Sequence, residues 1–310
     1  MAYSYNEANN NTALQQSLKN KLSKGQKIYL YGPGITINDF MNLLGINKEQ
    51  SKEELEKKQN AKFQSENVKY NVIGYSSDGS LYLATIGSEN EILPYMYLRA
   101  ILDDQIESLN KTQPTSMASG AIINNDIQLV KSANNINIYT YYLDTLMGQI
   151  NADWYLYRNL SESETDYDYF SVRDNVEVTA YNLASIDELW VDHDIPADID
   201  HIQDWGPEDN TSSSFQVSLP MGISWQFNTN GDVVVDEQGS QTLDYGRWEL
   251  SYKFGTTAMP NPTRFEPGTE WKSWGTYAYM QIRHRATFYI FGYNTHVDSP
   301  EQLITVEHDY

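Results

Sequence analysis

Residues 215–227 have the sequence Phe-Gln-Val-Ser-Leu-Pro-Met-Gly-Ile-Ser-Trp-Gln-Phe, in which apolar and small or polar residues alternate without a break. The apolar residues occupy every odd position: Phe215, Val217, Leu219, Met221, Ile223, Trp225 and Phe227. Because successive side chains of a strand point to opposite faces, this stretch predicts one long β-strand with one apolar face. That face needs an apolar partner, which is either the protein's own core, another subunit or lipid.

The rest of the second half repeats this strand pattern. Candidate strands occur at 136–143, 154–160, 170–181, 248–254, 277–293 and 303–307, with turn residues between them. Several strands at this spacing indicate a β-sandwich or open barrel. The predicted fold class is therefore mainly β, a β-sandwich or open barrel with long antiparallel strands, with a small N-terminal α+β unit.

The 310 residues exceed the usual size of one domain, so a division is expected. Residues 1–110 predict a small α+β unit with a mobile N-terminus, and 93–109 has the apolar spacing of a helix. Residues 111–135 are rich in Ser, Thr, Asn and Gly and predict a linker or crossover. Residues 136–310 then form the acidic antiparallel β domain.

Charge and cysteine content exclude several functions. The net charge is −21, and residues 1–130 hold 12 basic and 14 acidic residues, which leaves 9 and 28 for residues 131–310. A surface of that sign repels phosphate backbones, so no nucleic-acid partner is expected. The chain has no cysteine, which excludes disulfides, cysteine-bound zinc and thiol catalysis.

The apolar stretch also allows a membrane hypothesis. A strand of 215–227, a turn at Asn230-Gly231 and a return through residue 254 would form a hairpin whose odd residues face lipid. In this pattern the segment resembles the hairpins of β-pore-forming toxins. The alternative is a long amphipathic hairpin whose apolar face packs on the core of the sandwich.

Carboxylates cluster in residues 190–205, which contain five Asp and two His. The candidate metal ligands are Asp192, Asp194, Asp198, Asp200 and Asp204. Closely spaced carboxylates are what Ca²⁺ requires, so calcium is the one cofactor that the sequence suggests. The spacing of an EF-hand is missing, and a solvated acidic loop is the alternative.

An aromatic cluster follows residue 270 and contains Trp271, Trp274, Tyr277 and Tyr279. Ring faces of this kind suit either sugar stacking or an interfacial belt, and the alternative is packing in the core and at its rim. No motif for nucleophilic catalysis occurs, because the chain has no G-x-S-x-G and its histidines lack a recognisable partner. His284 stands out as the polar residue in an otherwise apolar strand face.

The sequence thus favours a β-rich binding or assembly protein without enzymatic activity, with a membrane-active, pore-forming-like protein as the first hypothesis. A structural, virion or surface-assembly protein and a glycan-binding module are the alternatives. The expected partners are further copies of the chain in a homo-oligomer, and a membrane or a surface glycan. Without a signal peptide or an apolar run of spanning length, the chain is expected to be either secreted or surface-exposed by a leaderless route, or soluble in the cytoplasm.

Overall fold

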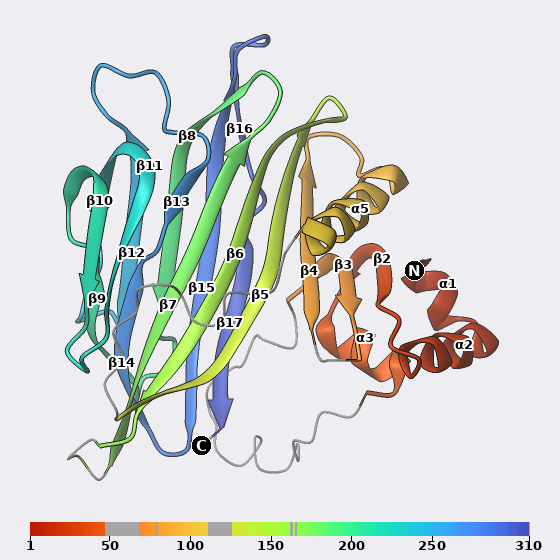
Figure 1. Cartoon of the computed structure of the whole chain (residues 1–310), viewed down its shortest axis with the longest axis horizontal. Helices are drawn as coiled ribbons and strands as arrows, with labels where there is room; N and C mark the ends of the chain where they lie inside the picture. The colour runs from red at the N-terminus through yellow and green to blue at the C-terminus, as the bar shows by residue number, and fades with distance from the viewer. Residues whose placement is uncertain (47–67, 78–79, 111–125, 162–163, 165, 310) are drawn as a thin grey trace. The chain divides into compact units, whose positions relative to one another are not determined.

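The computed structural model describes residues 1–46, 68–77, 80–110, 126–161, 164 and 166–309. The chain divides into two compact units: unit 1 comprises Met1–Ile86 and Glu91–Thr112, and unit 2 comprises Gly87–Asn90 and Gln113–Tyr310. Figure 1 shows that strands dominate the second half of the chain, whereas the helices of the described residues all lie in the first. The predicted fold class, mainly β with a small N-terminal α+β unit, is confirmed.

Unit 1 combines a small sheet with helices. Its elements are β1 (Ala2–Ser4), α1 (Tyr5–Asn9), α2 (Thr12–Leu22), β2 (Ile28–Ile35), α3 (Ile37–Leu44), β3 (Tyr70–Tyr75), β4 (Leu81–Ser88) and α5 (Pro94–Asn110). β1 pairs in parallel with β2, and β3 and β4 follow as antiparallel neighbours. A capping box of Thr36 and Asp39 begins α3, and Gly45 ends it with a φ of 66° that glycine adopts without strain.

Unit 2 consists of two antiparallel sheets. Its strands are β5 (Ile127–Tyr142), β6 (Thr145–Asn159), β7 (Tyr167–Ala180), β8 (Ala184–Asp194), β9 (His201–Gly206), β10 (Asn210–Ser218), β11 (Ser224–Glu237), β12 (Tyr245–Tyr252), β13 (Thr263–Phe265), β14 (Gly268–Trp274), β15 (Tyr277–Ile290), β16 (Thr295–Asp298) and β17 (Gln302–Asp309). In one sheet the order is β5-β6-β7-β14-β9, with β13 also on β7. In the other it is β10-β11-β12-β8-β15-β16, with β17 also on β15. The core lies between them and draws side chains from both sheets.

The long strand predicted for 215–227 is wrong in its connectivity. The stretch contains the end of β10, a turn and the start of β11, so it folds back on itself. The amide of Leu219 donates to the carbonyl of Ile223 at 2.9 Å, and Gly222 has a φ of 96°. Pro220 and Gly222 supply this turn, because proline cannot continue a ladder and glycine accepts a positive φ.

The turn expected at Asn230-Gly231 is instead an irregularity within β11. Asn228 of β11 pairs with Ser214 of β10, and Val233 pairs with Ser212. Five steps along β11 thus correspond to two steps along β10, so residues 229–232 bulge out of the ladder. Of the predicted linker, residues 127–135 belong to β5, and 111–125 lie outside the described residues. No helix among the described residues is long and apolar enough to cross a bilayer.

Candidate functional site

The predicted membrane-hairpin residues form a two-stranded ribbon, residues 214–228, called here the apolar ribbon. Phe215 pairs with Phe227 and Val217 with Trp225 across the ladder of β10 and β11. The ladder between β11 and β12 starts only at Val233, beyond the bulge. The ribbon therefore extends past the sheet from which it comes and has to be held by contacts of its side chains and its tip.

Those contacts place the apolar face of the ribbon in the core. All seven predicted residues from Phe215 to Phe227 are at most 8% exposed. The Trp225 indole donates to the carbonyl of Glu266 at 2.9 Å, and the Phe227 and Phe265 rings meet edge to face at 5.6 Å. As membrane-inserting residues these seven stay a prediction, while in this fold they close the core.

Buried charges lie directly beneath the ribbon. The Arg173 guanidinium donates to the Glu266 carboxylate and lies 5.3 Å from the Trp225 ring. At the tip, the amide of Met221 donates to the Glu270 carboxylate at 2.7 Å. Burial raises the pKa of Glu270 to about 7, although the bond from Met221 acts in the opposite direction. The tip thus depends on a carboxyl group that titrates near neutral pH.

The free energy needed to remove the apolar ribbon from the core decides whether it can leave the fold. Burying one large apolar side chain contributes about 1.5–3 kcal/mol, so seven of them contribute about 10–20 kcal/mol. That sum equals or exceeds the whole stability of a typical domain, which is about 5–15 kcal/mol. The ribbon can leave the core only if a partner of similar apolar area receives it.

A second buried polar cluster joins the two sheets. Oδ2 of Asp174 on β7 lies 2.6 Å from Nε2 of His284 on β15 and 3.3 Å from Nε2 of His193 on β8. Nδ1 of His193 lies 2.9 Å from the Thr269 hydroxyl on β14. Burial by itself would raise the pKa of Asp174, but the imidazoles of His284 and His193 outweigh it and hold this pKa at about 2.

This cluster has the residue types of a catalytic site but not its accessibility. Asp174, His193 and His284 are each 0% exposed, so a substrate cannot reach them. We interpret the cluster as a polar cross-link between the sheets. The sequence marked His284 as the exception in an apolar face; Asp174, between Val172 and Val176 of the same strand, breaks its pattern in the same way and could have been found by that signal.

The acidic segment 190–205 is not one loop. Asp192 and Asp194 end β8, where Asp192 accepts bonds from Arg247 and Arg283. Asp200 accepts from the amide of Trp274 at 2.9 Å, and burial raises its pKa to about 6.

The remaining acidic residues of the segment contribute separately. Asp204 accepts from the amide of Trp205, and Asp198 is exposed. Within the described ranges, no three of the side chains that bind metals come together as a site. Calcium binding stays a prediction.

The aromatic candidates are also separated by burial. Trp271 is fully buried against Phe170, with ring centroids 5.7 Å apart. Tyr277 and Tyr279 stack on each other at 6.4 Å, and Tyr279 is 3% exposed. Trp274 is the member of this set with a widely exposed ring, at 54%. The four rings therefore do not present one shared platform, and glycan binding stays a prediction.

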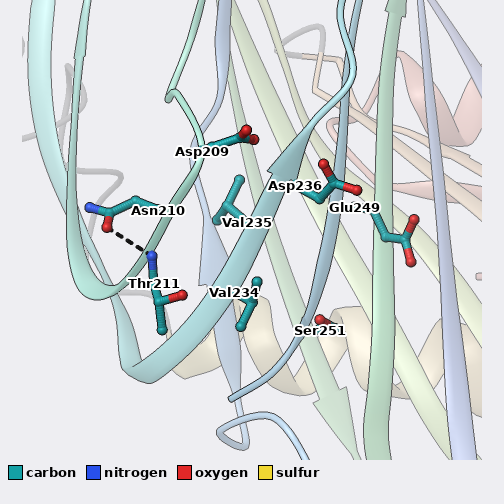
Figure 2. Close-up of a pocket in the computed structure, with 8 residues that line it drawn as sticks. All are labelled: Asp209, Asn210, Thr211, Val234, Val235, Asp236, Glu249 and Ser251. Atoms are coloured by element: carbon teal, nitrogen blue, oxygen red, sulfur yellow. Dashed lines mark hydrogen bonds between the residues drawn. The ribbon is translucent and has the colours of Figure 1, made fainter. Parts of the chain in front are cut away.

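A hollow of about 510 Å³ lies on the β10–β11–β12 side of unit 2, and Figure 2 shows the residues that line it. Its lining residues are Asp209, Asn210, Thr211, Val234, Val235, Asp236, Glu249 and Ser251. Asp236 and Glu249 are cross-strand partners. Burial and the neighbouring carboxylates of Glu188 and Asp236 raise the pKa of Glu249. The lining attracts cations and repels anions, and no other feature of the hollow identifies a ligand.

A group of exposed apolar side chains in unit 2 lies on three loops that the sequence pattern did not single out. These loops connect β5 to β6, β7 to β8 and β15 to β16, and Figure 1 shows all three at the upper end of the strands. The apolar loop end consists of Leu143 (48% exposed), Tyr181 (36%), Leu183 (61%), Phe291 (57%) and Tyr293 (55%).

Contacts connect the three loops to one another. The amide of Phe291 donates to the carbonyl of Leu183 at 3.1 Å, and the rings of Tyr142 and Tyr293 meet at 5.2 Å. Leu143 and Asp144 form a two-residue turn between paired strands, with φ values of 44° and 61°. Such turns normally use Asn and Gly, and a leucine in this conformation is strained by about 1–2 kcal/mol.

Comparison with known proteins gives matches of fold alone. No family model and no curated protein matches the chain. Among solved structures, similar chains include Clostridium perfringens delta-toxin, with 9% identity and a TM-score of 0.34. This match covers 61% of this chain and 93% of the toxin chain. A pore forming protein matches with 7% identity and a TM-score of 0.33 over 61% and 94% of the two chains. The Clostridium perfringens NetB toxin in its membrane inserted form matches with 6% identity and a TM-score of 0.29 over 61% and 97%. At these scores the likeness assigns no function to this chain.

Proposed function

We propose that this protein is membrane-active and that unit 2 binds the surface of a neutral membrane through the apolar loop end. The observation that carries the proposal is the exposure of five large apolar side chains on three adjoining loops. Exposed apolar patches of this kind mark sites of interaction with proteins or membranes. Leu143 is strained in its turn, where asparagine or glycine would fit with less strain but would supply no large apolar side chain. The presence of leucine at this position therefore supports a role beyond folding.

The charges around this end favour neutral lipid. The loop residues 143–144, 181–183 and 291–294 include a single charged side chain, that of Asp144. Phenylalanine, leucine and tyrosine insert favourably at the boundary between head groups and acyl chains, where the tyrosine hydroxyl stays hydrated. The chain as a whole, with a net charge of −21, is repelled by anionic head groups. The expected target is therefore a phosphatidylcholine-like surface.

Insertion of the apolar ribbon, as in the hairpin hypothesis, is a second step that the geometry supports less well. Each arm of the ribbon pairs over five residues, 214–218 with 224–228. A tilted strand needs about 9–11 residues to cross a bilayer. Surface attachment requires no such rearrangement and is the function that we conclude from the geometry.

The proposal is tested by sedimentation of the protein with phosphatidylcholine vesicles. Replacing two exposed residues, Leu183→Ser with Phe291→Ser, is expected to weaken binding roughly tenfold, because about 1.4 kcal/mol of apolar contact corresponds to that factor. Leu160→Ser is the matched control, since Leu160 is 56% exposed at the opposite end of the strands. Equal binding by the double variant and the wild type would contradict the proposal, as would a preference for anionic vesicles.

A disulfide separates surface binding from insertion of the ribbon. A Cβ placed on Gly206 would lie 3.4 Å from the side chain of Val217, so a Gly206→Cys and Val217→Cys pair can join the ribbon to β9. The chain has no other cysteine. We expect vesicle binding to be equal in the oxidised and the reduced protein. Dye leakage that appears only after reduction would show that the ribbon inserts.

A further inference from the structure

Helix α5 of unit 1 has two apolar faces, of which its own unit covers one. Met96, Ala100 and Ile101 are at most 4% exposed, and the carbonyl of Ala100 accepts a bond from the Tyr82 hydroxyl at 2.8 Å. This face follows the usual rule that an amphipathic helix buries its apolar stripe. It accounts for the attachment of α5 to the sheet of unit 1.

The opposite face carries a second apolar row, called here the α5 stripe. It consists of Tyr95 (43% exposed), Leu98 (44%), Leu102 (54%) and Ile106 (54%). The spacing of three, four and four residues places the side chains one above the other on the same side of the helix. A row of large exposed apolar residues over three turns is unusual for a surface helix and marks an interaction surface.

The charges beside the stripe indicate what covers it. Arg99 and Asp103 flank it on one side, with Nε and Oδ2 3.9 Å apart and the arginine 59% exposed. If a second α5 packs antiparallel across the stripe, each Arg99 meets the Asp103 of the other copy as well as its own. A parallel arrangement would put the two flanks on opposite sides and lose this match.

The same antiparallel arrangement pairs the apolar residues. A two-fold axis near residues 100–101 sets Leu98 against Leu102 of the second copy, and Tyr95 against Ile106. The stripe and its charged flank thus share one axis, which is the self-complementarity that an isologous interface requires.

The distribution of net charge favours contact through this unit. Residues 1–130, which include unit 1, hold 12 basic and 14 acidic residues and are close to neutral. Residues 131–310 hold 9 and 28, so two copies repel each other most strongly there. We propose that the α5 stripe is a contact surface between two copies of this chain, with the α5 helices antiparallel. The inference does not depend on membrane binding.

The size of the stripe sets the expected strength. Stable dimers bury about 1,200–2,000 Å² in total, whereas four half-exposed side chains on each copy provide less than that. The expected association is therefore weak and visible only at high protein concentration. It would strengthen where other contacts bring copies together.

Analytical ultracentrifugation of the full chain without lipid tests the proposal. The wild type should self-associate as its concentration rises, and Leu98→Glu with Leu102→Glu should weaken this at least roughly tenfold, because the change puts four carboxylates in the contact. Leu243→Glu, at a residue 66% exposed in unit 2, is the matched control and should behave like the wild type. Circular dichroism and the melting temperature establish that each variant is folded.

Cysteine cross-linking tests the antiparallel register. Mixing the variants Leu98→Cys and Leu102→Cys should give a disulfide-linked heterodimer under mild oxidation. Leu98→Cys alone should cross-link several-fold less, because its two copies would be offset by about four residues, or about 6 Å along the helices. Equal cross-linking of Leu98→Cys alone and of the mixture would overturn the antiparallel arrangement. A wild type that stays monomeric at every concentration would overturn the proposed contact between copies. Loss of vesicle binding in the Leu98→Glu, Leu102→Glu variant would also overturn it and would identify lipid as the partner of the α5 stripe.

Discussion

The apolar ribbon and the apolar loop end have similar side chains and opposite surroundings. Every odd residue of the ribbon from Phe215 to Phe227 is at most 8% exposed, whereas the five residues of the loop end are 36–61% exposed. The ribbon has a regular pattern that is visible in the sequence. The loop end has none, because its residues come from three loops far apart along the chain.

This contrast shows that a regular apolar pattern reports burial more reliably than function. Alternation arises where one face of a strand meets the core, so the best-patterned segment is the one that the fold itself uses. An apolar residue in a turn serves no such purpose and exposes its side chain to water. The candidate binding surface is accordingly found where the pattern is broken, and three predictions test that difference.

The largest expected effect is on stability. Trp225→Ala removes a buried ring from the ribbon and should lower the free energy of unfolding by about 3–5 kcal/mol. Phe291→Ala at the loop end should change it by no more than about 0.5 kcal/mol, because surface residues outside structural features rarely contribute more. Urea denaturation monitored by circular dichroism measures both. Similar losses for the two variants would remove the distinction between the regions.

The next largest expected effect is on the pH dependence of the unfolding free energy, through Glu270 at the tip of the ribbon. Burial raises its pKa from 4.5 to about 7, so folding takes place most favourably when this carboxyl group is protonated. Its contribution is complete below about pH 4.5 and is lost as the pH rises to about 7, with a total of about 3 kcal/mol.

Glu270→Gln should abolish the part of the pH dependence of stability that Glu270 causes. Because only the wild type then loses this contribution, the difference in unfolding free energy between the variant and the wild type should grow from pH 4.5 to pH 7. Vesicle binding by the folded wild type should stay constant over the same range, because Asp144 is the only carboxylate on the three loops. A parallel pH dependence in both proteins would contradict the assignment to Glu270.

The smallest effect has opposite signs for folding and binding. Asparagine adopts the left-handed conformation of residue 143 more readily than leucine does, so Leu143→Asn should raise the unfolding free energy by up to about 1 kcal/mol. The same change removes a 48% exposed apolar side chain and should weaken vesicle binding a few-fold. Thermal unfolding and vesicle sedimentation measure the two quantities. A variant that loses both stability and binding would show that Leu143 has a structural role.

Much of the architecture follows from the sequence, but the ribbon shows where periodicity fails. In the paired segment, the residue numbers of cross-strand partners add up to an even number, as for Val217 with Trp225. Odd residues therefore face odd residues, and the alternation continues unchanged through the turn. A single straight strand and a folded hairpin give the same pattern, and only Pro220 and Gly222 indicated the break.

Buried polar groups show a second limit of prediction from the sequence. His284 and Asp174 each interrupt an apolar strand face, and each interruption is visible in the sequence. That the two residues meet, together with His193, depends on how β7 packs against β8 and β15. The same holds for Asp192, which the sequence suggested as a calcium ligand and which bonds to Arg247 and Arg283.

The sequence by itself determined the strand-rich class, the acidic second half and the absence of cysteine chemistry, because local alternation and composition depend only on the order of residues. Tertiary structure alone decided which apolar residues are covered. The seven residues of the ribbon are buried in the core, where β13 and β14 contact them, whereas the residues of the loop end and the α5 stripe are at least 36% exposed. Burial is a property of contacts between segments distant in the chain, and periodicity within one segment does not contain it.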